Sequence, residues 1–450
     1  MYWRGWCYPR PSGSPRHTTP PRQRRQGTGR CRRPLAPGPR QARRTMSRAR
    51  AKPPKNPGIS PCPTTPCPTA LSHSTPGIPA AGTRTGLLTG LSRKPLPVIV
   101  PHDSSRSAKP MTNADVLAYQ AEALSGVSRT FALTIPQLPM PLRDVIGNAY
   151  LLCRIADTIE DEANLPLEKK EAYLHRFVHV VEGRASARDF GRELHPMLSE
   201  ATIEAERDLV ANMEPVVGFT HGLRRPQRAA IERCIGIMAP GMAEFQAKTT
   251  VQGLKDMRDL DRYCYCVAGV VGETITELFC DHSPAIHRRR DRLFALSAGF
   301  GQGLQMVNIL KDFWEDRERG ACWLPRNVFA DFGLDLSTLV PGKDDARKLA
   351  GALYRLIRVA AGHLGSAFQY TMLIPAKEAG IRRFLLWSLG MAVQTLGRLA
   401  ESPAFVNGEQ VKISRKEVRA IVLATSALVR WDRGLGWMFD RAVGRIARPS

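Results

Sequence analysis

Long apolar runs are missing from this sequence. The longest uncharged apolar stretches, residues 384–393 and 420–429, are well short of the roughly 18 residues needed to span a bilayer. No transmembrane anchor is therefore predicted. Strand-like alternation of apolar and polar residues is nearly absent, and no repeat of about 20 to 50 residues is apparent, which argues against a solenoid.

Acidic residues are scarce near the amino end. The 450 residues include 65 Lys and Arg against 41 Asp and Glu, a net charge of +24. Residues 1–110 hold 21 of the basic residues and a single acid, Asp103, so the rest of the chain is close to neutral. The body is therefore expected to be an ordinary globular protein, without specific nucleic-acid binding.

The first 110 residues also contain 21 of the 35 prolines and few large aliphatic side chains before Leu87. This composition cannot bury enough surface to offset the entropy lost on ordering, so a disordered basic tail is predicted for residues 1–110. Three explanations of the tail stay open: a transit peptide, whose amphipathic helix the prolines would break, a nucleic-acid contact, or a reading frame taken too far upstream. We favour the last, with Met111 as the working start.

Motifs for several common chemistries are absent. The glycine-rich stretch 299–303 lacks the third glycine of a dinucleotide fingerprint, and neither a nucleotide P-loop nor a nucleophile triad is present. Of the ten cysteines, Cys264 and Cys266 have no matching pair downstream for a zinc site. The six cysteines of the body are expected to be buried free thiols in a reducing compartment.

From Met111 onward, apolar residues recur at helical spacing. Asn113 or Asp115 is expected to cap the first helix, and most prolines of the body, Pro240 among them, fall near expected helix borders. The longer helices are predicted at residues 143–162, 224–250, 259–280, 291–316, 348–373 and 381–399. The expected fold class is all-α, with residues 111–450 forming one single-domain helical bundle.

Two polar rows stand out on these predicted helices. The first has offsets of 0, 4, 7 and 11 residues, which lie on one helical face: Tyr150, Arg154, Asp157 and Asp161, with Glu160 alongside. The second has offsets of 0, 3, 7 and 11: Gln305, Asn308, Asp312 and Asp316. Taken alone, the first row is better explained as a solvated acidic face. Apolar residues surround the second row, which indicates a buried helix whose carboxylates need partners.

Two oxygen-rich rows on separate helices suit Mg²⁺, which prefers carboxylate oxygens, water and substrate phosphate. Basic side chains lie close to the rows in sequence: Arg129, Arg154, Lys311, Arg317 and Arg319. Each alone is more often a surface charge, but together with Mg²⁺ they would neutralise a departing pyrophosphate. The pattern predicts a site for an allylic diphosphate.

The segment 259–272 places aromatic rings, Tyr263 among them, ahead of a run of small residues. Aromatic faces stabilise a carbocation through the ring quadrupole. Close helix packing explains the small residues equally well, and both interpretations hold together.

These segments resemble the head-to-head prenyl synthases, the family of squalene and phytoene synthases. Five segments occur in the family's order: 128–131, 150–161, 263–272, 305–316 and 320–325. The resemblance covers the body and none of the tail. It implies the all-helical isoprenoid-synthase bundle, with the two acidic rows facing each other across the mouth of a central apolar cavity.

The resemblance also implies roles for individual residues. The metal ligands for Mg²⁺ are Asp157, Glu160, Asp161, Asn308, Asp312 and Asp316. The substrate contacts are Arg129, Phe131, Tyr150, Arg154, Gln305, Lys311, Arg319 and Phe405. Tyr263 corresponds to a tyrosine that assists the first half-reaction, while Lys412 and Arg415 are candidate NADPH contacts or simply a basic surface loop.

The implied reaction joins two farnesyl diphosphates into presqualene diphosphate, which NADPH then reduces to squalene. Proton loss without reductant would instead give dehydrosqualene, or phytoene from geranylgeranyl diphosphate. The sequence after residue 384 is more similar to squalene synthases. A remote alternative is a nucleic-acid-binding protein that acts through its basic tail.

Two departures from the family pattern concern diphosphate contact. Lys311 stands where eukaryotic squalene synthases usually have Arg, and Ala321 follows Gly320 where many relatives have Arg. Lys lacks the bidentate fork of a guanidinium. Without the C-terminal anchor of the eukaryotic enzymes, the chain more closely resembles a bacterial enzyme. We expect a cytoplasmic monomer that contacts the membrane peripherally.

Overall fold

The computed structural model describes residues 111–446, which belong to one compact unit. The predicted disordered tail lies outside the described residues. The first helices are α1 (Asn113–Val127), α2 (Arg129–Thr134), α3 (Leu142–Asp161), α4 (Leu167–Val181), α5 (Ala187–Leu194), α6 (Glu204–Ala211), α7 (Met213–Gly222) and α8 (Arg225–Lys248).

The second half continues with α9 (Met257–Cys264), α10 (Val270–His282), α11 (Pro284–His287), α12 (Arg290–Lys311), α13 (Phe313–Glu318), α14 (Arg326–Ala330), α15 (Ala346–Leu373), α16 (Ala379–Glu401), α17 (Arg415–Leu428) and α18 (Asp432–Ile446). Short helical turns are η2 (Ile135–Gln137), η3 (His195–Met197), the π-helical η4 (Tyr265–Gly269) and η5 (Gly408–Val411). The all-α fold class is confirmed.

Local sequence signals explain several helix ends. Thr112, not Asn113 or Asp115, is the N-cap of α1, and it forms a reciprocal capping box with Asp115. Asp345 caps α15 by accepting from two backbone N–H groups. Pro240 was expected near a border but lies inside α8. Packing of α8 against α3, α4 and α10 supports the helix there.

Two predicted helices are interrupted where the candidate site residues lie. The window 259–280 consists of α9, the π-helical η4 and α10, and π-helical turns occur frequently at functional sites. The window 291–316 breaks at Asp312, whose φ of −94° and ψ of 12° end α12 and start α13. Hydrogen bonds from Asp312 N to Asn308 O (2.8 Å) and from Asp316 N to Asp312 O (2.9 Å) bridge the break.

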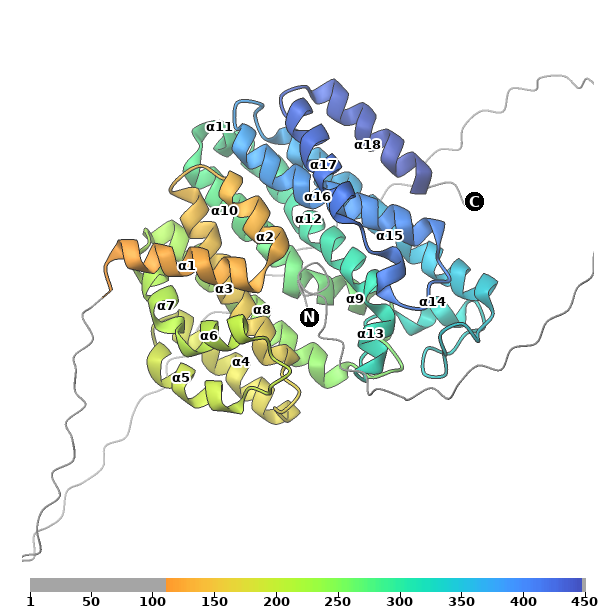
Figure 1. Cartoon of the computed structure of the whole chain (residues 1–450), viewed down its shortest axis with the longest axis horizontal. Helices are drawn as coiled ribbons and strands as arrows, with labels where there is room; N and C mark the ends of the chain where they lie inside the picture. The colour runs from red at the N-terminus through yellow and green to blue at the C-terminus, as the bar shows by residue number, and fades with distance from the viewer. Residues whose placement is uncertain (1–110, 447–450) are drawn as a thin grey trace, which may run out of the picture. The chain divides into compact units, whose positions relative to one another are not determined.

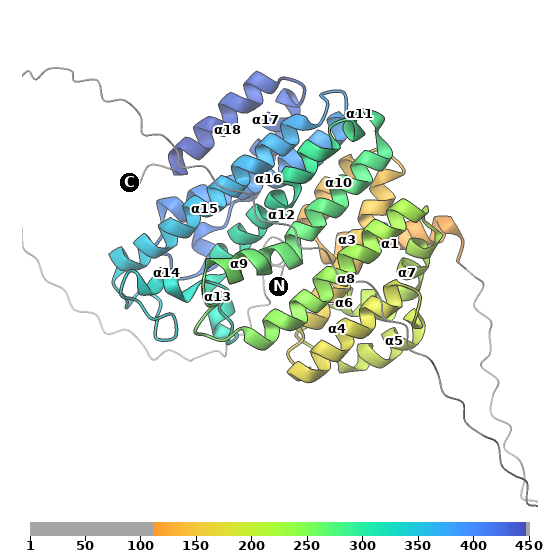
Figure 2. The same ribbon diagram turned by 180° about the vertical axis from the view of Figure 1, so that it is seen from behind.

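The helices pack side by side around a long central set. Seen from behind, α15, α12, α10, α8 and α4 follow one another across the molecule, and each contacts the next (Figure 2). Helix α3 lies against α8 and α10, while α16 lies against α12 and α15 (Figure 1). Helix α3 is buried at every position from Tyr150 to Glu160. Its polar residues are therefore enclosed by protein.

One helix of the described chain, α12, is long and apolar enough to cross a membrane by length and composition. Of its most apolar window, 67% is buried inside the protein, as expected for the core helix of a bundle. All six cysteines between residues 111 and 446 are buried free thiols, as predicted.

The backbones of α12 and of the η4–α10 segment approach each other closely. A Cβ atom at Gly301 would overlap the carbonyl oxygen of Ala268, and one at Gly272 would overlap that of Ser297. Only glycine permits this approach, because its neighbours here are rigid backbone. The small residues of this segment therefore serve close helix packing.

Replacing Gly301 with Ala should destabilise the protein by about 3 kcal/mol, because two packed helices must separate to admit one methyl group. The matched control is Gly299→Ala in the same helix, where the nearest atom would lie 3.6 Å from the new Cβ. That change should be neutral or stabilising by up to about 1 kcal/mol. Urea unfolding measures both, and equal stability of the two variants would contradict the packing argument.

Candidate functional site

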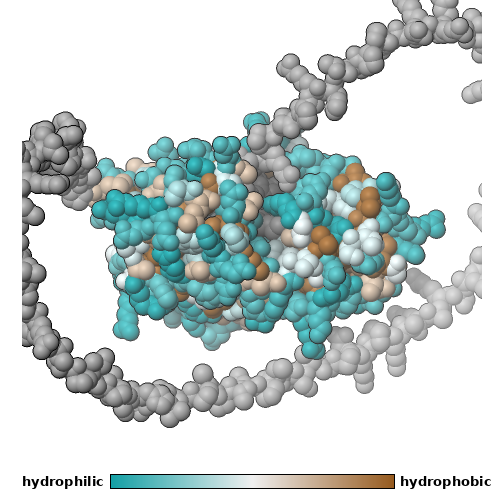
Figure 3. Space-filling model, turned by 90° about the horizontal axis from the view of Figure 1, so that it is seen from below, coloured by the Kyte–Doolittle hydropathy of each residue, from teal (hydrophilic) through white to brown (hydrophobic). Residues whose placement is uncertain are grey.

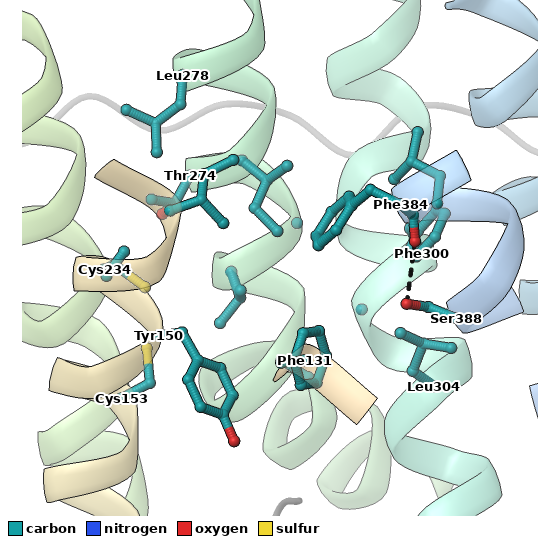
Figure 4. Close-up of a pocket in the computed structure, with 18 of the residues that line it drawn as sticks. Phe131, Tyr150, Cys153, Cys234, Thr274, Leu278, Phe300, Leu304, Phe384 and Ser388 are labelled. Atoms are coloured by element: carbon teal, nitrogen blue, oxygen red, sulfur yellow. Dashed lines mark hydrogen bonds between the residues drawn. The ribbon is translucent and has the colours of Figure 1, made fainter. Parts of the chain in front are cut away.

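An apolar pocket lies in the middle of the bundle, enclosing about 890 Å³ of empty space, part of it open to solvent. Helices α2, α3, α8, α10, α12, α15 and α16 all contribute to its wall. Figure 4 shows Cys153 and Cys234 with their sulfur atoms toward one another on one side and Phe300 and Phe384 on the other. A hydrogen bond with Cys234 and burial raise the pKa of the Cys153 thiol. The wall contains no Asp, Glu, Lys, Arg or His side chain, which suits a hydrocarbon.

Tyr150 connects this pocket to the first acidic row. Its ring lines the pocket and stacks on Phe131 at a centroid distance of 4.9 Å. Its hydroxyl accepts a hydrogen bond from Arg154 Nη2 at 2.9 Å. The Arg154 guanidinium also lies 3.8 Å from Asp157 Oδ2 and 3.5 Å from Glu206 Oε1 of α6. All three ionic groups are almost completely buried, so this cluster is not the solvated face that the row alone suggested.

The carboxylates of the first row are only partly compensated. Asp157 Oδ2 and both oxygens of Glu160 accept no hydrogen bond from the described residues. Burial raises the pKa of Asp157 to about 6, with Arg154 opposing the shift and Asp161 adding to it. Burial likewise raises the pKa of Glu160 to about 8. Buried oxygens without donors are costly unless a ligand satisfies them.

The second row occupies the end of α12 and the start of α13. Gln305, Asn308 and Asp316 are buried, while Asp312 stands at the break between the two helices. Lys311 is buried and forms an ion pair with Asp312. Burial raises the pKa of Asp316 to about 8, against the opposing charge of Arg319. This row therefore shares the electrostatic character of the first.

Arg319 links the two rows. It forms an ion pair with Asp316 and also interacts electrostatically with Asp161 of α3 and with Asp312. Burial lowers the pKa of the guanidinium, but these three carboxylates outweigh burial and raise it. Because carboxylates of both α3 and α13 act on this one guanidinium, the two rows lie near each other.

The carboxylates of the two rows suit an Mg²⁺ ion that is also bound by water and substrate phosphate. Among the described residues, no three His, Cys, Asp or Glu side chains are grouped closely enough to hold an ion by themselves. Mg²⁺ commonly binds through one or two carboxylates, several waters and substrate phosphate, not through an all-protein cage. The carboxylate oxygens of Asp157 and Glu160 that accept no hydrogen bond from the described residues suit such a site.

Tyr263 lies outside the apolar pocket wall, at the end of α9. It is completely buried, and its ring stacks on Trp323 with a centroid distance of 4.0 Å and an interplanar angle of 2°. Phe245 of α8 packs on it at 5.2 Å. The ring is thus held rigidly just before the π-helical turn that leads to the pocket residues Ala268 and Gly272.

The segment after α16 is attached to α13. Trp314 Nε1 donates to the Phe405 carbonyl at 2.6 Å, and Gly408 N donates to Glu315 Oε1 at 2.7 Å. Lys412 follows directly and pairs with Glu409 at 2.6 Å, and Arg415 is exposed at the start of α17. Phe405 is buried. These contacts anchor the segment beside the second acidic row.

Two of the predicted basic residues lie in contrasting surroundings. Arg317 does not face a diphosphate site: its guanidinium donates to the backbone carbonyls of Val251, Leu336 and Leu339. It therefore holds loops together, because a planar group with five N–H donors suits several carbonyls at once. Arg129 is exposed at the start of α2, two residues before Phe131 of the pocket wall.

Sequence reasoning missed the partners that orient these groups. Glu206, buried beside Arg154, lies on a short helix with no motif around it. Lys170 of α4 donates to the Glu160 carbonyl at 2.7 Å and interacts electrostatically with Asp161. Trp323 was included in a recognised segment, but its stack with Tyr263 was not foreseen. Each contact is tertiary, and no spacing along the chain indicates it.

Known proteins resemble this chain in sequence. Squalene synthase ERG9 of Candida albicans (strain SC5314) is 27% identical over 311 residues, which are 68% of this chain and 67% of that protein. Squalene synthase clz20 of Cochliobolus lunatus is 28% identical over 301 residues, covering 66% of this chain and 68% of that protein.

Solved structures share the fold. A complex of TcSQS with the ligand E5700 superposes with a TM-score of 0.60 at 23% identity, over 75% of this chain and 94% of that one. A dehydrosqualene synthase in complex with ligand gives a TM-score of 0.51 at 18% identity, over 70% and 97% of the two chains. At these identities the likeness concerns the fold alone.

The family model for squalene/phytoene synthase matches residues 124–417. This segment is more than half of the chain and contains both acidic rows, Arg319, Tyr263 and the whole apolar pocket wall. The chain therefore belongs to the squalene/phytoene synthase family.

Proposed function

We propose that the protein condenses two farnesyl diphosphates head to head into presqualene diphosphate and reduces this intermediate to squalene with NADPH. The observation that carries the proposal is the meeting of two acidic rows at Arg319, next to an apolar pocket. Such a site takes a charged diphosphate at one end and a hydrocarbon chain at the other. The sequence relatives named squalene synthase support the choice of product.

Asp157, Glu160 and Asp161 of α3 would hold Mg²⁺ on one side, and Asn308, Asp312 and Asp316 on the other. The metal, when bound, neutralises diphosphate charge and favours its departure. Arg154, Lys311 and Arg319 are proposed to stabilise the departing anion, and the ion pair of each with a carboxylate of a row supports this role. Burial of Arg154 and Lys311 strengthens their interactions by excluding water.

The remaining residues would handle the carbon skeleton and the reductant. The pocket, with Phe131 and Tyr150 in its wall, shields a prenyl cation from water, and Phe405 lies in the adjoining segment. Tyr263, fixed by Trp323, is proposed to assist the first half-reaction. Lys412 and Arg415 are proposed to contact the phosphates of NADPH, which supplies hydride to the second half-reaction. Gln305 and Arg129 are proposed substrate contacts.

Paired incubations test the proposal directly. The protein is supplied with farnesyl or geranylgeranyl diphosphate, each with Mg²⁺ and with or without NADPH, and the products are identified by mass. We expect squalene from farnesyl diphosphate with NADPH. Formation of dehydrosqualene independently of NADPH, or of phytoene from geranylgeranyl diphosphate, would change the assigned product. Either result would still support the assignment of the site. No condensation from either substrate would overturn the proposal.

Asp157→Asn and Asp312→Asn should each lower turnover by at least about a hundredfold, because a ligand charge is lost with little change in shape. Product formation from farnesyl diphosphate measures the effect, and circular dichroism checks that the fold persists. The control is Asp331→Asn, an exposed carboxylate paired with Arg355 away from both rows. If the Asp157 and Asp312 variants retain activity like the control, the assignment of the rows is wrong.

The raised pKa of Glu160 predicts a pH-dependent stability. The pKa of Glu160 is about 8 in the folded protein and has its ordinary value of 4.5 when the chain is unfolded, so the folded state binds the extra proton between these pH values. Without divalent metal, stability should therefore fall as pH rises through this window, by at most about 1.4 kcal/mol per pH unit from this group. Asp157 and Asp316 act in the same direction.

Glu160→Gln should make this dependence shallower, because the amide does not titrate. Urea unfolding in a chelator at pH 5 and pH 8 measures the slope in both proteins. Adding Mg²⁺ should stabilise the parent more at pH 8 than at pH 5, since ionised carboxylates bind the metal. An identical slope in the variant and the parent would contradict the prediction.

A further inference from the structure

The last two helices form a separate layer on the outer edge of the bundle. Helices α17 and α18 contact each other and pack on α16, and α18 also contacts α15 (Figure 1). Their inner sides carry buried residues such as Thr425, Val429 and Leu435. Nothing in the proposed reaction uses this layer beyond Arg415 at its start.

The outward sides of these two helices are unusually apolar for a surface. Leu423 is 71% exposed on α17, Trp431 is 60% exposed in the connecting turn, and Trp437 is 66% exposed on α18. The other tryptophans between residues 111 and 446, namely Trp314, Trp323 and Trp387, are all buried. By contrast, the face seen from below, away from α17 and α18, is mostly hydrophilic (Figure 3). The exposed indole rings are thus concentrated in one layer.

Positive charge surrounds these apolar side chains. The exposed basic residues of the layer are Arg415, Lys416, Arg419, Arg430, Arg433, Arg441 and Arg445. Two of its three acids are neutralised from the core helix: Glu417 by Arg398 at 2.7 Å and Asp432 by Arg382 at 2.6 Å. Only Asp440 opposes the basic residues. The outward side therefore has a clear net positive charge.

Apolar and basic residues share the same helical faces. Arg419 and Leu423 are four residues apart on α17, and Arg433 and Trp437 are four apart on α18, so each pair lies on one face. The Arg441 guanidinium lies 5.8 Å from the centroid of the Trp437 ring. Each helix therefore presents an indole or leucine side chain flanked by guanidinium groups.

We propose that the outer face of α17 and α18 binds an anionic phospholipid bilayer. Tryptophan favours the membrane–water interface, and arginine beside it pairs with anionic headgroups, so the arrangement matches a helix that lies in the plane of the interface. A second copy of the chain would bring the same positive charges together and is disfavoured.

This surface is one helix away from the prenyl pocket. Helix α16 carries Phe384 and Ser388 on the pocket wall, and its opposite side, with Leu389, borders a second apolar hollow beneath α17 and α18. A membrane bound at this face would receive a water-insoluble hydrocarbon close to where it forms. The binding inference itself goes beyond the proposed reaction and does not depend on it.

The test is sedimentation of the full chain with vesicles, in the absence of substrate. Vesicles of phosphatidylglycerol and phosphatidylcholine are compared with phosphatidylcholine alone, and the parent should bind only the anionic ones tightly. The double variant R419E/R433E should lose about tenfold or more of that affinity. The control R192E/R225E reverses two exposed charges on α5 and α8 and should remain within about twofold of the parent.

A second measurement reports on the apolar contact. Vesicles whose acyl chains carry bromine should quench tryptophan fluorescence in the parent, and W431F/W437F should bind but lose most of that quenching. Equal binding by R419E/R433E and the parent would overturn the proposal. The basic residues 1–110 are the same in both proteins, so equal binding would assign the interaction to a part of the chain other than α17 and α18. Unchanged quenching in W431F/W437F, or self-association without vesicle binding, would overturn it as well. Because no substrate is present, failure here is separate from failure of the proposed reaction.

Discussion

The structure depends on keeping several carboxylates out of water. Asp157, Glu160 and Asp316 are buried, and the pKa of each is raised because the surrounding protein solvates a negative charge poorly. Arg154 and Arg319 compensate only part of that charge. Folding therefore leaves negative charge that is not fully compensated where α3 and α13 lie near each other. A metal–diphosphate complex is a ligand whose cations neutralise that charge. Binding and charge neutralisation are the same event at this site.

The remainder of the bundle bears the cost of this arrangement. Buried charges with incomplete partners destabilise a protein, so the neighbouring packing has to be firm. Helix α3 is enclosed over its whole second half, and α12 contacts α10 and η4 through glycines. The apolar pocket lies between these rigid elements. Because these helices are packed firmly, the pocket between them keeps its shape without a ligand.

The sequence predicted the parts of the site that follow from helical periodicity. The offsets within each row place Asp157 with Asp161 on α3 and Gln305 with Asn308 on α12, because each pair lies within regular helix. The sequence did not predict the features of the site that depend on tertiary contacts. The break at Asp312, the use of Arg317 by loop carbonyls and the pairing of Arg154 with Glu206 depend on segments remote in the chain. The prediction that the two rows face each other came from the family resemblance, because helical periodicity does not predict how two helices are oriented.

The contact between glycines and carbonyl groups also constrains the shape of the apolar pocket in this protein. Gly272 and Gly301 belong to the pocket wall, and the two backbones there are already as near as van der Waals radii permit. The position of the wall on that side is therefore fixed by the two backbones, and substitution of side chains does not change it. The volume of the chamber can change only where its wall carries larger side chains, such as Phe300, Phe384 and Leu278.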